Sequence, residues 1–355
     1  MDKPFDSPDS NRIKYPFTIV YNMHISHPAS EKHLEGGIKT SIQNQREAFE
    51  KQGISYTPRF SRDADILHLN VPTPRTYVQL RRAKRAGIPV VMHTHEIGEN
   101  FQESFRLSTT FSPIVRRYVD FFYKRADHLI APSEYAKRVL KQRGLNTPIS
   151  VVTNGIDPDR LAGVYTGEYS PKSTIERNGE QESRLTVANA SILFERKGLS
   201  DFTAVARQLQ DVNFAWFGPR FNRFLTGSSV DKTIQQAPSN CVFPGFADDV
   251  RDVYTASDVF FFPTKSETEG ISIIEAAYCG IPIVTRDIPV YEPLLEHGTH
   301  CLKGSSVEEF KNHIKLLQND PELRKRLGEN ARELAEQFTI GAVGKELESV
   351  YQTTV

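Results

Sequence analysis

Cysteine is scarce in this sequence, and long apolar runs are absent from it. The three cysteines, Cys241, Cys279 and Cys301, are too few and too scattered for a disulfide framework or a metal site. Because apolar residues surround them, we expect them to be buried and the protein to be cytoplasmic, in a reducing compartment. No apolar run approaches the roughly 20 residues that cross a bilayer, and the first six residues are too acidic and polar for a signal peptide. The sequence therefore predicts a soluble protein, or one bound at most to a membrane surface.

Excess charge of either sign is also absent. Lys and Arg together number 44, as do Asp and Glu, so the formal net charge is zero and nucleic acid is not expected as a partner. Residues 1–160 nevertheless carry 24 basic and 17 acidic side chains, whereas residues 161–355 carry 20 and 27. This asymmetry predicts two domains with different partners.

Strands and helices alternate along most of the chain. Short apolar runs that are typical of buried strands precede helical patterns ending at glycine, as in Ile66–Leu69, then the basic stretch Tyr77–Ala86, then Pro89–Met92. Such βαβ units predict an α/β protein with parallel sheets. We expect two Rossmann-like, doubly wound domains that face a cleft, with a ligand at the carboxyl ends of the strands.

Composition and length indicate where these domains begin and end. At roughly 150 residues per domain, the chain accommodates two, and the first is expected to open with a strand at Phe17–Tyr21. A stretch rich in Gly, Ser, Glu and Lys interrupts the alternation and is typical of a linker. The expected parts are a disordered leader (1–15), a first domain (16–162), a linker (163–183), a second domain (184–339) and a helix that rejoins the first domain (340–355).

The strongest pattern joins a strand end, a polar loop and a helix start. Glu267 lies in the loop, where a carboxylate can accept hydrogen bonds from the hydroxyls of a sugar, and Glu275 lies in the first turn of the helix. Either glutamate alone is also explained as an acidic residue that favours the positive end of a helix. Free backbone N–H groups at the helix start form an anion site; they belong to Gly270, Ile271, Ser272 and Ile273.

Two further patterns suit phosphate groups. Arg196 and Lys197 stand side by side after the first predicted strand of the second half; Arg can bind a diphosphate through two hydrogen bonds and Lys as a point charge. Gly36 and Gly37 follow the first predicted strand of the chain, where paired glycines let the backbone approach a ligand closely. Each pattern alone is also typical of a solvated helix start or a turn.

A polar group follows the strand at Pro89–Met92. His95 and Glu96 come shortly after this strand. His93 and His95 with a glutamate could hold a metal ion, but the spacing places no third ligand, and we expect no metal site. If the strand continues, His93 and His95 project to opposite faces, and His93 is expected to be a packed histidine or one that supports the site without touching a ligand.

Together these residues resemble the retaining glycosyltransferases of family 4, which have the GT-B fold. The hallmark of that family is a Glu, seven residues and a second Glu, followed by Ala, a small residue, Gly and Pro, and Glu267 to Glu275 matches it in spacing and context. The resemblance covers residues 17–350. Two positions depart from the family: Glu269 stands where members commonly have Phe or Gly, and Ile192 where many members have an arginine.

The resemblance implies a role for each group of residues. The catalytic residues would be His95, which orients the sugar near the reacting carbon, and Glu267, which contacts the donor sugar. The residues implied in donor binding are Gly36, Gly37, Arg196, Lys197, Gly270, Ile271, Ser272, Ile273 and Glu275, the last at the nucleotide ribose. Those implied on the acceptor side are Glu96, Glu99, Arg106 and Asn154. No cofactor and no metal ion is expected beside the nucleotide-sugar co-substrate.

The region 104–125 combines aromatic and basic side chains in an amphipathic pattern. A surface helix that dips into an anionic leaflet has this composition, and so does a helix that packs on the core with a solvated basic edge. Further basic clusters, Arg81–Arg85 and Lys137–Arg143, lie in the same half. The stretch Glu99–Phe105 resembles glycolipid-forming members such as diacylglycerol glucosyltransferases, which implies a peripheral location on the inner face of a membrane.

The sequence thus predicts transfer of a hexosyl group from a UDP- or GDP-linked sugar to a hydroxyl acceptor, either a membrane lipid or a lipid-linked glycan. Two alternatives stay open. A sugar-nucleotide epimerase would share the architecture, although its acid/base cluster is not evident. A degenerate family member would act as a binding subunit, against which the intact Glu267, Glu275 and Lys197 argue.

Overall fold

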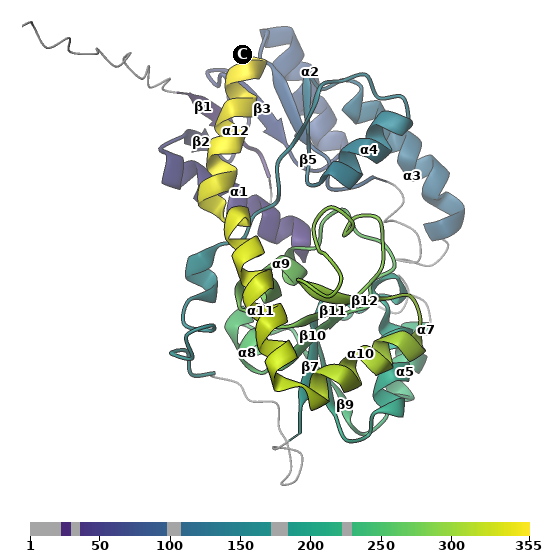
Figure 1. Ribbon diagram of the computed structural model, residues 1–355. Helices are drawn as coiled ribbons and strands as arrows, with labels where there is room; N and C mark the ends of the chain where they lie inside the picture. Colours follow the sequence, from purple (N-terminus) through teal and green to yellow (C-terminus); the bar gives the residue numbers. More distant parts are fainter. Residues whose placement is uncertain (1–22, 30–35, 98–107, 172–183, 222–228) are drawn as a thin grey trace, which may run out of the picture.

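The computed structural model describes residues 23–29, 36–97, 108–171, 184–221 and 229–355. Within them the strands form two six-stranded sheets, one in each half of the chain, and all neighbouring strands run parallel. Figure 1 shows the two halves as separate layered bodies, with the C-terminal helices running from one to the other.

The first sheet has the strand order β2-β1-β3-β4-β5-β6. Its strands are β1 (His24–Ser26), β2 (Ser55–Thr57), β3 (Ile66–Leu69), β4 (Val90–His93), β5 (His128–Ala131) and β6 (Ile149–Val151). Its helices are α1 (Gly37–Gln52), α2 (Pro74–Ala86), α3 (Ser108–Tyr123) and α4 (Glu134–Gln142). Apolar side chains are buried on both faces of this sheet, one face against α1 and the other against α2, α3 and α4.

The second sheet has the order β12-β11-β10-β7-β8-β9. Its strands are β7 (Thr186–Ala190), β8 (Asn213–Phe217), β9 (Cys241–Gly245), β10 (Val259–Phe262), β11 (Ile283–Arg286) and β12 (Cys301–Gly304). The helices of this half are α5 (Leu199–Gln208), α7 (Ser229–Gln235), α8 (Val250–Thr255), α9 (Ile271–Tyr278), α10 (Val307–Asn319) and α11 (Pro321–Ala335). Helix α12 (Ile340–Thr354) follows, and short 3-10 turns lie at Pro158–Leu161, Glu195–Lys197 and Glu336–Phe338.

Local sequence explains why these elements form where they do. Helix α2 starts at a capping box, in which the Thr73 side chain accepts from the N–H of Thr76, and it ends at Gly87 with φ +73°. All four residues of β10 are buried, which explains its uninterrupted apolar sequence Val-Phe-Phe-Phe because a central parallel strand is covered on both faces.

Strand order fixes where a ligand can bind. In each sheet the order in which strands are added reverses next to the first strand: β2 lies on one side of β1 and β3 on the other, and β8 lies on one side of β7 and β10 on the other. Loops on the two sides of such a point diverge and leave a crevice at the carboxyl ends of the strands. The segments that follow β1, β4, β7 and β10 carry Gly36 and Gly37, His95, Lys197, and Glu267, respectively.

Helix α12 returns to the first half and packs along α1, as Figure 1 shows. Gln52 Nε2 donates to the carbonyl oxygen of Gly341 at 3.3 Å, and the buried Tyr351 hydroxyl lies 2.8 Å from His68 Nδ1. Ile340, Val343 and Leu347 join the apolar core beneath the first sheet. A helix from the end of the sequence thus completes the core of the first sheet.

The predicted fold class, two doubly wound α/β domains facing each other, is confirmed. The cysteines are free and buried, as expected, and no described helix has the length and apolar character of a membrane span. Sequence analysis overlooked five of the described strands and helices: β1, β2, β12, α7 and α10. The strand expected at Phe17–Tyr21, the leader and residues 172–183 of the linker lie outside the described residues, and the proposed domain limits stay predictions.

Candidate functional site

A cavity of about 410 Å³ lies between the two halves, at the carboxyl ends of both sheets. Residues from both halves line it. The first half contributes Gly36, Gly37, His95, Glu96, Asn154 and Arg160, and the second half contributes Ile192, Arg196, Lys197, Phe246, Glu267, Gly270, Ile271, Ser272 and Glu275, among others. Most residues that the sequence pattern singled out therefore meet in one place.

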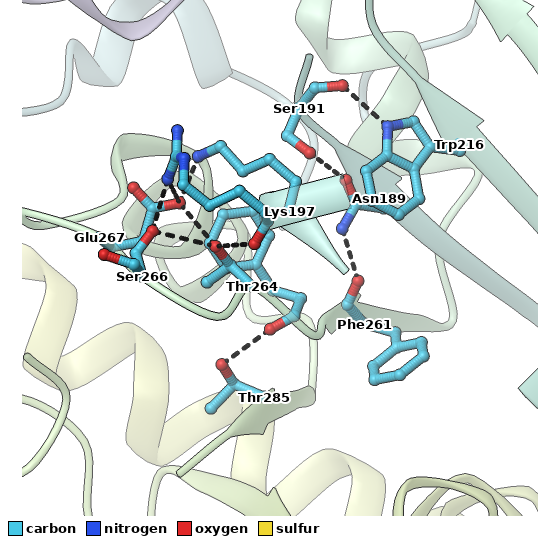
Figure 2. A network of polar contacts seen from close by, with 11 residues as sticks. Asn189, Ser191, Lys197, Trp216, Phe261, Thr264, Ser266, Glu267 and Thr285 are labelled. Carbon is cyan, nitrogen blue, oxygen red and sulfur yellow. Dashed lines mark hydrogen bonds and ion pairs between the residues drawn. The ribbon is translucent and has the colours of Figure 1, made fainter. Parts of the chain in front are cut away.

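A buried charged cluster forms one wall of the cavity. The Lys197 ammonium donates to Glu267 Oε1, and the Thr264 hydroxyl donates to the same oxygen at 3.0 Å. Arg196 Nη1 lies 3.8 Å from that oxygen and donates to the carbonyl oxygen of Ser266. Figure 2 shows Lys197 and Glu267 pointing toward one another above Thr264. The cluster ties the loop after β7 to the loop between β10 and α9 (residues 263–270, the β10–α9 loop).

The backbone places Lys197 beside this loop. Gly198 has φ +84°, and a Cβ at that position would lie 2.4 Å from the carbonyl oxygen of Pro263, so only glycine permits the approach. Hydrogen bonds to the neighbouring strand β10 also hold the start of the loop after β7, as Figure 2 shows. Asn189 Nδ2 donates to the carbonyl oxygen of Phe261 at 2.8 Å, and Ser191 Oγ donates to Asn189 Oδ1 at 2.7 Å.

The cluster keeps Glu267 ionised. Burial by itself raises the pKa of this carboxyl, but the charges of Lys197 and Arg196 and the hydrogen bonds from Lys197 and Thr264 outweigh it, so the pKa falls below its ordinary value. Burial also lowers the pKa of Lys197, against the attraction of Glu267. The cavity thus contains a carboxylate that can accept hydrogen bonds from hydroxyl groups, next to two cationic groups.

The start of α9 faces the cavity through Gly270, Ile271 and Ser272. Gly270 has φ +96°, and a Cβ there would lie 2.8 Å from the Tyr291 hydroxyl. The sequence grouped Ile273 with these residues, but the Ile273 N–H donates to the carbonyl oxygen of Gly270 at 3.2 Å and its side chain is buried in the core. At this helix start, the residues that line the cavity are therefore those before Ile273.

Glu275 lies on the same wall, deeper in the helix. The Tyr254 hydroxyl donates to Glu275 Oε2 at 2.7 Å. Burial raises the pKa of this carboxyl, while the charge of Arg160 and the hydrogen bond from Tyr254 oppose that rise. Arg160 comes from the 3-10 turn that leaves the first half, so this corner of the cavity also combines groups from both halves.

The first of the paired glycines approaches the second half closely. Gly36 has φ +67°, and a Cβ there would lie 2.8 Å from Ile192 Cδ1. Ile192 is the position at which the resembled family often has arginine. No side chain caps α1 at Gly36, and the start of this helix, Gly37 and Ile38, lines the cavity together with Ile192.

His95 lies where β4 has ended, on the opposite side of the cavity. His95 Nε2 lies 2.8 Å from Asn70 Oδ1, and its ring stacks on that of His93 with centroids 4.4 Å apart. The two rings do not project to opposite faces because β4 ends at His93. Burial lowers the pKa of His95 to about 3, with a smaller contribution from His27, so the ring is neutral near pH 7. Glu96 lines the cavity, whereas Glu99 and Arg106 lie outside the described residues.

Asn154 connects the two halves. Its backbone N–H and its Nδ2 donate to Glu269 Oε2 at 3.1 and 2.5 Å, and the Thr153 hydroxyl donates to Glu269 Oε1. Burial raises the pKa of Glu269 to about 7 although these hydrogen bonds lower it. The departure from the family pattern at Glu269 thus forms a bridge between the halves.

Within the described residues, no three His, Cys, Asp or Glu side chains converge as metal ligands would. The expectation that the reaction needs no metal ion stays a prediction.

Sequence analysis missed several residues around the cavity. Tyr254, Arg160 and Phe246 line or support it, and Ser133, which caps α4, also donates to the carbonyl oxygen of Thr268 at 2.6 Å. Their signals are weak because each depends on contacts between distant segments. Only Phe246, a large aromatic residue after a strand, could have been suspected.

Two family models match the chain. The model described as "Glycosyl transferases group 1" matches residues 172–334, and the model described as "Glycosyltransferase Family 4" matches residues 53–160. Their matches cover the sites of Lys197, Glu267 and Glu275 in one half and of His95 and Asn154 in the other.

Curated relatives extend over most of the chain. The processive diacylglycerol alpha-glucosyltransferase of Acholeplasma laidlawii is 30% identical over 326 residues, which cover 90% of this chain and 95% of that protein. The alpha-galactosylglucosyldiacylglycerol synthase of Streptococcus pneumoniae is 26% identical over 294 residues, covering 81% of this chain and 77% of that protein.

Solved structures match the fold. HepE of Anabaena, in complex with UDP and glucose, superposes with a TM-score of 0.71 at 18% identity, covering 94% of this chain and 99% of that one. Sucrose-phosphate synthase from Thermosynechococcus elongatus reaches a TM-score of 0.74 at 14% identity, covering 93% and 98%. These similarities confirm the expected GT-B architecture.

Proposed function

Because the chain belongs to the glycosyl transferases of group 1, we propose that it moves a hexosyl group from a UDP- or GDP-linked sugar to a hydroxyl of a membrane lipid or lipid-linked glycan, with retention of configuration. That it is a glycosyltransferase follows from its relatives. The epimerase and the inert binding subunit are therefore set aside. The observation that carries the finer proposal is the meeting of Lys197, Arg196 and Glu267 with the start of α9 in one cavity between the halves.

This arrangement suits the departure of a nucleoside diphosphate. Negative charge grows on the diphosphate as the sugar leaves, and fixed cations and backbone N–H groups that face it lower the barrier. Lys197 and Arg196 supply the cations, while the amides of Ile271 and Ser272 supply N–H groups. The Lys197 ammonium has three protons, so it can contact the diphosphate and keep its hydrogen bond to Glu267.

Two carboxyl groups and one histidine suit the sugar and the ribose. Glu267, held ionised by its cationic neighbours, accepts hydrogen bonds from hydroxyls of the transferred sugar. Glu275 lies further along the cavity, next to Tyr254, and accepts from the ribose. His95, which is neutral near pH 7, forms a hydrogen bond with a sugar hydroxyl near the reacting carbon and adds no positive charge there.

The glycolipid relatives support a lipid acceptor. Two of them are named as enzymes that glycosylate diacylglycerol or its glycosides, and the A. laidlawii relative is named for an alpha linkage. An alpha product from an alpha-linked nucleotide sugar is a retained configuration, which supports the retaining assignment.

Helix α3 presents a surface that fits a membrane. It buries Val119, Phe122 and Tyr123 against the first sheet. A second apolar stripe at helical spacing faces solvent: Phe111 is 49% exposed, Ile114 61%, Tyr118 42% and Phe121 37%. We call these four residues the α3 stripe. Isolated exposed apolar residues are ordinary, but a contiguous stripe on one helix marks an interaction surface.

Basic residues flank the α3 stripe. Arg117, Lys124 and Arg125 are exposed on or just after α3, and Arg81 and Arg85 are exposed on the neighbouring α2. Three members of the predicted basic clusters form ion pairs within the protein instead: Lys84 pairs with Asp127, Lys137 with Glu134, and Arg143 with Asp120. The remaining cations suit the anionic inner face of a membrane, where each contributes about 1 kcal/mol near the surface. We therefore propose a cytoplasmic enzyme that binds this face peripherally.

The test is direct assay of sugar transfer. A panel of UDP- and GDP-sugars is screened with the purified protein for thermal stabilisation, and the sugars that bind are then assayed for transfer to diacylglycerol and its glycosides in vesicles. Glu267→Ala and Lys197→Ala should strongly reduce transfer to any acceptor that the native protein accepts. Unimpaired transfer by either variant would refute the proposed site.

A further inference from the structure

Glu269 crosses from the second half to the first. Its side chain is almost fully buried and leaves the β10–α9 loop between Glu267 and Gly270. It accepts hydrogen bonds from three groups of the first half: the Thr153 hydroxyl, the Asn154 backbone N–H and Asn154 Nδ2. Within the described residues, the hydrogen bonds of this side chain therefore run to the first half and not to its own half.

A second bond fixes the same loop to the first half one residue earlier. The Ser133 hydroxyl, at the start of α4, donates to the carbonyl oxygen of Thr268 at 2.6 Å and accepts from the N–H of Ala136 at 3.1 Å. Consecutive residues of the β10–α9 loop are thus held by two different segments of the first half. The first half holds this loop at Thr268 and Glu269, and Lys197 of the second half holds it at Glu267.

From Asn154 a line of buried side chains leads to His95. Ser41 Oγ donates to Asn154 Oδ1 at 2.6 Å, and Gln45 Nε2 donates to Ser41 Oγ at 3.1 Å and to Asn70 Oδ1 at 3.0 Å. Asn70 Oδ1 in turn lies 2.8 Å from His95 Nε2. The carboxylate of Glu269 and the ring of His95 are therefore connected through four intervening polar side chains, all of them buried.

A carboxylate suits this place because it only accepts hydrogen bonds. Its three neighbours are all donors, and an ionised glutamate has lone pairs for each of them. A phenylalanine or glycine would leave the Asn154 amide and the Thr153 hydroxyl without this acceptor, and a buried unsatisfied donor is costly. Tyr291 is an ionisable group close enough to interact with the charges of both Glu269 and Glu267.

We propose that Glu269 is a positioning residue: it fixes the β10–α9 loop against the first domain, so that the sugar held by Glu267 is aligned with His95 and the acceptor. This inference rests on the proposed transfer reaction. Glu269 touches neither donor nor acceptor in this role. Its loss should therefore impair the alignment of the two substrates while the nucleotide still binds.

The test compares Glu269→Gln with the native enzyme in three measurements. Calorimetry gives the Kd of UDP and of GDP, and turnover with the donor from the screen gives kcat for transfer to acceptor and for hydrolysis without acceptor. We expect the nucleotide Kd to stay within about twofold, transfer kcat to fall at least tenfold, and hydrolysis to fall less, so that the ratio of hydrolysis to transfer rises. A side chain with a structural role alone would not change this ratio.

Two outcomes would overturn the inference. Transfer within twofold of the native rate would show that the bridge does not position the loop. A nucleotide Kd that weakens in proportion to the lost transfer would assign Glu269 to donor binding instead. If the native protein binds neither nucleotide and transfers no sugar, the proposed function fails, whatever Glu269→Gln does.

Two further variants keep the test decisive. Thr153→Val removes one donor and leaves the carboxylate, so it should give a smaller fall in transfer in the same direction even if Glu269→Gln folds poorly. Asp258→Asn is the matched control, because this carboxylate also accepts a backbone N–H, that of Thr186 at 2.7 Å, but at the amino end of the second sheet. Its transfer rate and hydrolysis ratio should equal those of the native enzyme.

Discussion

The Lys197 ammonium and the Glu267 carboxylate are in direct contact inside the cavity, with only 14% and 9% of their side chains exposed. Each keeps the other charged in a place where burial alone would favour the neutral forms. The pair thus places a cation and a hydrogen-bond acceptor side by side before any substrate binds. A reaction in which a diphosphate leaves a sugar needs both.

Removal of Lys197 should affect the rate more than the binding of the nucleotide. Lys197→Ala takes away a cation that faces the developing diphosphate charge, so we expect kcat/KM for transfer to fall by about 10²- to 10³-fold. Steady-state kinetics with the screened donor measure this. Lys311→Ala on α10, whose lysine pairs with Glu308 away from the cavity, should leave kcat/KM unchanged. A loss below fivefold for Lys197→Ala would contradict the assignment.

A methyl group at Gly270 should distort the start of α9. Its Cβ would collide with the Tyr291 hydroxyl at 2.8 Å, and φ of +96° is unfavourable for alanine. We expect Gly270→Ala to weaken UDP or GDP binding about tenfold and to lower the melting temperature. Gly270→Ala combined with Tyr291→Phe should recover part of the affinity because the hydroxyl is gone. Calorimetry would contradict the explanation if the double variant bound no better than the single one.

Phe246 should contact the nucleobase. It lines the cavity beside Ala247 and Val250 yet is 72% exposed, which leaves its ring open to a planar ligand. Stacking of an aromatic ring on a base contributes about 1–3 kcal/mol, so Phe246→Ala should raise the donor KM about tenfold with little change in kcat. Val242→Ala, which alters an exposed apolar residue on β9 outside the cavity, is the control. Equal donor KM in native protein and Phe246→Ala would place the base elsewhere.

The free energy of unfolding should depend on pH through Glu269. Burial raises its pKa from 4.5 to about 7 in the folded protein. A raised carboxyl pKa contributes stability that is fully present below pH 4.5 and is lost as the pH rises through 7. At about 1.4 kcal/mol per unit of pKa, the loss amounts to about 3 kcal/mol.

Glu269→Gln removes this titration. The stability of the variant, expressed as its free energy of unfolding minus that of the native protein, should therefore be higher at pH 8 than at pH 5. The expected difference is up to about 3 kcal/mol. Urea unfolding of both proteins at the two pH values measures the difference, and any hydrogen bond lost at both pH values cancels. A relative stability that does not change between pH 5 and pH 8 would show that Glu269 titrates normally.

The α3 stripe should mediate binding to anionic vesicles. Replacement of Phe111, Ile114 and Phe121 by Ser removes apolar groups that would enter the interface, so co-sedimentation with vesicles containing phosphatidylglycerol at low salt should fall at least fivefold. Leu316→Ser, at an exposed apolar position on α10, should bind like the native protein. If the native protein fails to bind these vesicles, a soluble acceptor is favoured.

Sequence predicted best the elements whose signals are local. Helix α4 has such a signal because Ser133 caps its start, and β10 has one because four consecutive buried apolar residues are bounded by Asp258 and Pro263. Helix α10 was overlooked although Ser306 caps it and Phe310, Ile314 and Leu317 repeat at helical spacing. The sequence signal of strand β12 is weak, since the strand has only four residues and lies at the edge of its sheet.

The residues of the site also fall into those with a local sequence pattern and those without one. Glu267, Glu275, Lys197 and the paired glycines belong to short patterns whose spacing carries meaning, and the cavity brings them together. The partners that hold them could not be read from the sequence. Thr153 contacts Glu269 across 116 positions and Ser133 contacts Thr268 across 135, and no local pattern records such a pairing.

The return of α12 to the first half has a consequence for how the protein folds during synthesis. Tyr351 reaches His68 across 283 positions, and Ile340, Val343 and Leu347 cover apolar residues of the first sheet. A nascent chain that has produced only the first half lacks this cover, so its core stays partly open until the second half has been made. The first domain to emerge should therefore be the last to reach its final stability, and contacts that span so much sequence should make this closing step slow.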